Sequence, residues 1–253
     1  MATISIPVDA DRGEARFFLT MAGVMAAIIV AGFSLNIVMG RSSFGLPWLV
    51  HFHAWVMMGW VGLYLTQNAL IFGNNVALHR RLGWLSVAWI PLILVMGVLI
   101  TRWSLQSHGG PPFFDQNQFL ISNPLHLFGF ACLATSAIAV RRTTAWHRRL
   151  MYCAFATLTG PGVGRLLPAP LLIPYAWYIA AVLPPVLLAL TGVLADRRRY
   201  GRAHPAWFWG IGTVIGLQIA ADLIAYSDAG IAFTQQLLAG TPGAARPLTA
   251  FVP

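Results

Sequence analysis

Residues 78–84 read LHRRLGW, and residues 146–152 read WHRRLMY. The two segments share the letters HRRL, have an aromatic residue two positions after them, and stand at the start of long apolar runs. An apolar run with histidine near its start precedes each of them. This pattern predicts a duplicated pair of helices. A unit of two helices returns to the same side of a bilayer, so its copies would be related by an axis along the membrane normal.

The composition around these segments is that of a chain that spans a membrane. Of the 253 residues, 58% are hydrophobic and 9% are charged, whereas soluble domains carry about 25% charged residues. This balance excludes an ordinary soluble enzyme and a disordered chain. The 16 basic residues are all arginine, so there is no lysine to form the Schiff base of a retinal protein. The arginines stand beside apolar runs, which favours a lipid bilayer over nucleic acid as the partner of a chain with net charge +9.

We therefore predict an all-α membrane protein in which residues 1–253 form a single integral membrane domain. Seven apolar runs have roughly the length of about 20 residues that a transmembrane helix needs. They are 17–39, 48–72, 82–103, 122–140, 150–167, 171–195 and 207–225. The second to fifth runs, within residues 48–168, would form a four-helix core from the duplicated pair. Residues 226–253 would form a tail outside the membrane.

The arginines predict the orientation of these helices. Twelve of them fall on one side of the predicted membrane and four on the other. By the positive-inside rule, the larger group lies in the cytoplasm, which places the N-terminus inside and the C-terminus outside, in what we expect to be a bacterial inner membrane. The twelve are Arg12, Arg16, Arg80, Arg81, Arg141, Arg142, Arg148, Arg149, Arg197, Arg198, Arg199 and Arg202.

The duplication also predicts two layers of histidine. Equivalent helices of a four-helix core face each other across its axis, so His53 would lie opposite His126 near the outer face, and His79 opposite His147 near the inner face. Two facing imidazoles are what a haem b with two histidine ligands requires. We prefer His53 to His51 because these two side chains point in nearly opposite directions, and polar residues continue only the face of His53.

Basic residues adjoin the inner pair. Arg80 and Arg148, with their neighbours Arg81 and Arg149, would bind the propionates of a haem, since arginine binds carboxylates through two parallel hydrogen bonds. The alternative is that these four arginines bind anionic lipid at the membrane surface.

The placement of His53, His79, His126 and His147 resembles that in the transmembrane ascorbate-reducible dihaem cytochromes b. The segment 78–83 also resembles the LHRRLG motif of uncharacterised bacterial multi-pass proteins. The first resemblance covers about residues 48–168 and implies that these four histidines ligate two haems. It also implies electron transfer across the bilayer, the activity of a transmembrane oxidoreductase, with a small reductant or quinone as partner. The chain departs from that family in having seven predicted helices rather than six.

Two other functions remain open from the residues alone. The first is a non-haem site for zinc, copper or iron at the outer face, with ligands drawn from the histidines there and from Asp115. The second is a structural or assembly subunit without a cofactor, in which the histidines are merely interfacial. The histidines of the first alternative are His51, His53, His108 and His126.

Three further features bear on the outer face. The loop 102–121 could cap a site there. The stretch 159–165 reads TGPGVGR. It could shape a pocket for a reductant or quinone, in which Arg165 would bind an anion. The alternative is that its proline and glycines only kink the helix. Asp222 is a carboxylate within a predicted span and therefore a candidate for proton relay or for pairing with arginine.

Overall fold

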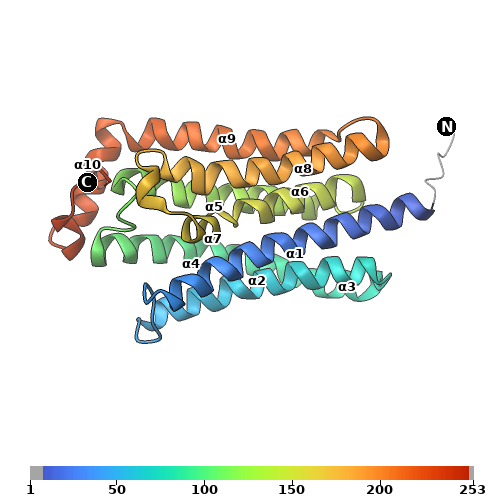
Figure 1. The fold of residues 1–253 in the computed structure, drawn as a ribbon, viewed down its shortest axis with the longest axis horizontal. Coiled ribbons are helices and arrows are strands. Elements are labelled where there is room, and N and C mark those ends of the chain that lie inside the picture. Colours follow the sequence, from blue (N-terminus) through green and yellow to red (C-terminus); the bar gives the residue numbers. More distant parts are fainter. Residues whose placement is uncertain (1–7, 251–253) are drawn as a thin grey trace.

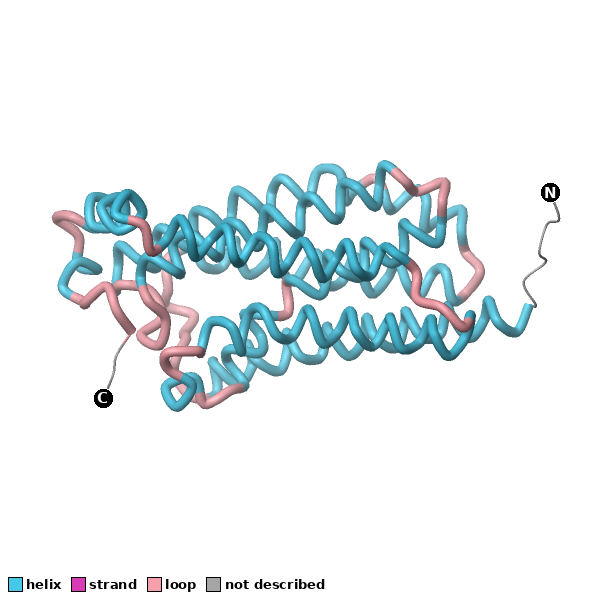
Figure 2. Tube along the Cα trace, turned by 90° about the horizontal axis from the view of Figure 1, so that it is seen from above, coloured by secondary structure: helices cyan, strands magenta, loops and turns pink. Residues whose placement is uncertain are grey.

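The computed structural model describes residues 8–250, with side chains from residue 12 onward. In this part of the chain every regular element is helical, and no strand occurs. The longest helices run along the long axis of the molecule, as two views at 90° to each other show (Figure 1 and Figure 2). The α-helices are α1 (Val8–Val38), α2 (Trp48–Phe72), α3 (Val76–Gly83), α4 (Leu85–His108), α5 (Gln116–Ala139), α6 (Thr144–Thr157), α7 (Gly160–Leu166), α8 (Leu183–Tyr200), α9 (Pro205–Ala225) and α10 (Asp228–Leu238).

Five helical segments are long and apolar enough to cross a membrane, which fits an integral membrane protein. They are Arg12–Val38, Leu85–His108, Gln116–Ala139, Tyr178–Tyr200 and Pro205–Ala225. Two of the seven predicted runs are not among them. The run 48–72 forms α2, which has 25 residues but carries two histidines together with Gln67 and Asn68. The run 150–167 is divided between α6 and α7.

Proline and glycine explain where the observed helices differ from the predicted runs. The break between α6 and α7 falls just before Gly160 and Pro161. The run 171–195 begins as a 3-10 turn (Ala169–Leu172) and becomes continuous helix only from the π-helical turn Tyr178–Val182. Pro184 and Pro185 follow this turn and supply no backbone N–H to a regular helical ladder.

The connection predicted at 102–121 is much shorter in the structure. Helix α4 continues to His108 and ends at Gly109, whose φ of 78° is a left-handed conformation that glycine adopts readily. Helix α5 already begins at Gln116. The predicted tail also folds back on this end of the molecule, because α10 packs against α5 and α9 and the 3-10 turn Pro242–Ala245 packs against α4. Residues 251–253 of that tail lie outside the described residues.

Helix α5 packs against α4, α6 and α9, and α1 packs against α2 and α7. Between these groups, large aromatic side chains meet in the middle of the molecule. Trp60 of α2 contacts Phe130 of α5 with ring centroids 5.2 Å apart, and Tyr64 contacts Phe155 of α6 at 4.2 Å. All four side chains are buried. They form an aromatic layer between the two ends of the molecule.

The two ends differ in charge. One end of the molecule is formed by the N-terminal part of α1, α3, the start of α6 and the end of α8 (Figure 1). These helical parts and the connections from α5 to α6 and from α8 to α9 carry twelve arginines, and we call this the basic end. The opposite end carries α7, α10 and the connection between α4 and α5 (Figure 1).

Candidate functional site

The basic end brings together one of the two predicted histidine pairs. His79 of α3 and His147 of α6 lie with ring centroids 6.2 Å apart and ring planes at 81°. Helix α3 is turned back beside α2 because Asn74 adopts a left-handed φ of 58°. The Asn75 side chain then caps α3 by accepting a hydrogen bond from the Leu78 N–H at 3.2 Å.

The second ring nitrogen of each histidine has a polar partner. His147 Nδ1 donates to the carbonyl oxygen of Ala137 at 2.9 Å, which leaves Nε2 of the neutral ring with a free lone pair. The amide of Gln67 lies against His79. Oriented to satisfy its neighbours, it donates to His79 Nδ1 and to the His79 carbonyl, and it accepts from the Gly83 N–H at 2.9 Å. In the opposite amide orientation, Gln67 Oε1 would accept from Nδ1–H and free the lone pair on His79 Nε2.

Burial favours the neutral form of both imidazoles. Burial, followed by the neighbouring His147 ring, lowers the pKa of His79, and Arg80 lowers it further. Burial also lowers the pKa of His147, as does the charge of Arg141. A neutral imidazole is the form that binds a metal ion.

The charges around the pair disfavour a bare metal cation. Arg80, Arg81, Arg141 and Arg142 are exposed on the segments that carry or precede the two histidines. They create a positive potential that repels a divalent cation and attracts an anionic ligand.

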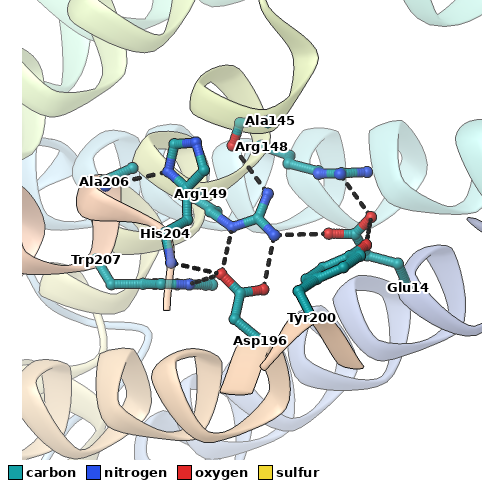
Figure 3. Close-up of polar contacts among 9 residues, drawn as sticks. All are labelled: Glu14, Ala145, Arg148, Arg149, Asp196, Tyr200, His204, Ala206 and Trp207. Carbon is teal, nitrogen blue, oxygen red and sulfur yellow. Dashed lines mark hydrogen bonds and ion pairs between the residues drawn. The ribbon is translucent and has the colours of Figure 1, made fainter. Parts of the chain in front are cut away.

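A buried ionic cluster lies beside this pair and was not predicted (Figure 3). The guanidinium of Arg149 is only 2% exposed. It donates to Asp196 through Nε at 2.8 Å and Nη2 at 2.6 Å, and through Nη2 to Glu14 at 2.8 Å. Arg148 pairs with the other Glu14 oxygen at 2.5 Å. These contacts tie together α1, α6 and α8.

Further donors complete the cluster (Figure 3). Trp207 Nε1 of α9 donates to Asp196 at 2.7 Å, and the Tyr200 hydroxyl donates to Glu14 at 2.8 Å. Arg149 is therefore engaged inside the protein rather than with propionates or lipid, and Arg148 shares the carboxylate of Glu14 with it. Arg80 and Arg81 are exposed.

At the opposite end, His126 takes part in a polar network. Its Nε2 donates to Gln218 Oε1 of α9 at 2.9 Å, and its ring meets that of Trp177 at 5.7 Å. Trp177 Nε1 donates to the same Gln218 oxygen at 2.7 Å. The Gln218 amide nitrogen donates to Asp222 at 2.8 Å. His126 and Asp222 were singled out from the sequence, whereas the glutamine that joins them was not.

The other outer-face candidates lie apart. His51 Nε2 donates to the carbonyl of Phe44 at 3.2 Å, and the ring of His108 packs on Trp103 at 5.7 Å. Asp115 accepts from the Tyr226 hydroxyl at 2.7 Å and from the Ala250 N–H at 2.6 Å. Among the side chains that the structure describes, those of residues 12–250, no group of three or more His, Cys, Asp or Glu is arranged to hold a metal ion.

Replacing Gln218 with leucine is expected to lower the free energy of unfolding by roughly 1–2 kcal/mol, because it leaves buried polar groups of Trp177 and His126 unpaired. Thermal unfolding of the protein in detergent measures this change. The matched control is Gln236→Leu on the exposed face of α10. Equal unfolding temperatures for the two variants would contradict the importance of the network.

Comparisons of the chain with models of protein families, with curated proteins and with solved structures find no match.

Proposed function

We propose that this protein is an integral membrane haem protein that transfers electrons, with the haem iron held between His79 and His147. The observation that carries the proposal is the 6.2 Å separation of these rings. An ion bound by one nitrogen from each ring would place the ring centres about 6 Å apart, because a metal–imidazole bond is about 2 Å long. Bound haem would supply a reversible one-electron couple.

The charges of the basic end support haem over a free metal ion. A haem carries two propionates, and Arg80 and Arg81 are exposed beside His79 to bind them. The carbonyl of Ala137 orients His147 in the way that carbonyl groups commonly orient metal-binding histidines. His79 would become a ligand when the Gln67 amide turns over, which gives up the hydrogen bonds of that amide with the His79 carbonyl and the Gly83 N–H.

We further propose that the chain crosses the membrane seven times, with the basic end in the cytoplasm. Helix α2 has the length of a span, and α6 followed by α7 runs past the aromatic layer toward the opposite end. The positive-inside rule supports the orientation. The meeting of the two HRRL histidines supports a duplicated helix pair. The aromatic layer would keep water from passing between the two ends.

The proposal places one haem at the basic end. A second, between His53 and His126, would require His126 to leave Gln218. The electron donor or acceptor would be a small reductant or a quinone.

The test is the absorption spectrum of the detergent-solubilised protein expressed with sufficient haem. We expect a Soret band that sharpens and shifts on reduction with dithionite, and its loss in His147→Ala and His79→Ala. His108→Ala is the control, because that side chain is exposed and lies against Trp103, away from the basic end. A colourless wild-type protein that is folded and haem-free would refute the proposal. Loss of half of the haem in His126→Ala would reveal the second site.

A further inference from the structure

Arg165 is a cation without a carboxylate partner. Its guanidinium lies 4.1 Å above the ring of Phe33, and its Nη1 donates to the carbonyl of Pro161 at 2.8 Å. Its Nε is shielded from solvent and has no hydrogen-bond partner. Among the side chains of residues 12–250, the carboxylates that pair with arginine are Glu14 and Asp196, both at the basic end.

The packing of α7 on α1 holds Arg165 in this place. A Cβ atom added to Gly32 would lie 2.2 Å from the carbonyl oxygen of Gly162, so the two backbones touch. Phe33 follows Gly32 in α1, and Arg165 lies three residues after Gly162. The position of the guanidinium is therefore set by backbone contact.

A second buried nitrogen without a hydrogen-bond partner belongs to His53 of α2. This nitrogen is Nδ1, whereas the ring as a whole interacts with the backbone of Met96 and with the charge of Arg165. Two turns further along α2, buried Trp60 also has a ring N–H without a partner. Leaving a buried polar group unpaired costs about 1–3 kcal/mol. Trp60 belongs to the aromatic layer, so the unpartnered nitrogens at the outer end are those of Arg165 and His53, and they point to a ligand that belongs there.

We infer that Arg165 and His53 form a binding site for an oxyanion, a phosphate or a carboxylate. Arginine stays charged at every physiological pH and matches the geometry of such groups. The site lies five residues before the end of α1, at the end of the molecule opposite the arginine clusters, where the headgroups of a bilayer would lie. The anion is then either the headgroup of an anionic lipid or a small free anion. This inference does not depend on haem binding.

The experiment titrates the full-length protein in dodecyl maltoside with two probes, dioleoyl phosphatidylglycerol and inorganic phosphate. Thermal unfolding reports binding, because a ligand of the folded state raises the unfolding temperature. Native mass spectrometry gives the stoichiometry. We expect one saturable site that Arg165→Gln weakens by roughly tenfold to a hundredfold, since hydrogen bonds to charged groups contribute about 1.5–3 kcal/mol.

Arg102→Gln is the matched control, because Arg102 is exposed at the same end and its Nε donates to Gln106. It should bind like the wild type, and Arg165→Lys should retain part of the affinity. If Arg165→Gln fails to fold, His53→Phe replaces it, with a smaller loss expected. Binding of the lipid alone identifies a headgroup site, and binding of phosphate identifies a site for free anions. Binding that is equal in the wild type and the variants, or no saturable binding of either probe, would overturn the inference.

Discussion

Arg149→Leu is expected to lower the free energy of unfolding by about 3–5 kcal/mol, the typical cost of removing one partner of a buried ion pair. The substitution leaves the carboxylates of Glu14 and Asp196, both buried, without their shared cation. Since Arg149 joins α6 to α1 and α8, the loss should also separate these helices at the basic end. Thermal unfolding in detergent, together with the yield of monodisperse protein, measures the effect.

The repeat provides a matched control within the same chain. Arg81 has the position in the first HRRL that Arg149 has in the second, but its side chain is exposed. Arg81→Leu should therefore change the stability by no more than about 0.5 kcal/mol. Similar destabilisation by the two substitutions would show that the buried cluster is not what makes Arg149 important.

Gly32→Ala is expected to destabilise the protein by about 1–3 kcal/mol or more, the cost of overpacking a tight contact. The added methyl group would lie 2.2 Å from the Gly162 carbonyl oxygen, and backbone atoms cannot yield as a flexible side chain does. Helices α1 and α7 would have to move apart, which would also displace Arg165 from Phe33. Denaturation followed by tryptophan fluorescence measures the change.

Gly23→Ala on the same helix should not lower the free energy of unfolding. A Cβ atom there has no neighbour within 4 Å, and alanine is favoured over glycine in a helix by about 0.5–1 kcal/mol. We expect Gly23→Ala to be neutral or stabilising. If Gly32→Ala were equally harmless, the close packing of α1 on α7 would be incorrect.

Much of the architecture follows from local sequence. Low charge and long apolar runs predict membrane helices because burial in lipid depends on the composition of each segment. The HRRL repeat led to the pairing of His79 with His147, which the structure brings together at 6.2 Å. The predicted ends of the helices were less accurate. The ends of these helices fall at glycine and proline near residues 109, 160 and 174, and the effect of a glycine or proline on a helix depends on the surrounding packing.

The outer histidines show where such reasoning stops. His126 and His53 were paired because the duplication suggested that their helices face each other. In the structure, α9 supplies Gln218, and this side chain engages His126 at 2.9 Å. Helix α9 lies outside the duplicated helix pair, so the duplication does not predict which side chains of α9 contact His126.

The amino-acid pattern alone predicts an α-helical membrane chain with an arginine-rich end, because hydrophobicity and charge are properties of single residues and short segments. The different roles of the two identical HRRL segments become visible only in the packing of the helices. Arg81 remains at the surface, whereas Arg149 is enclosed by Glu14 and Asp196, which are 135 and 47 residues away along the chain. A charged side chain can be buried only where the fold places oppositely charged side chains in contact with it, and this depends on which helices pack together.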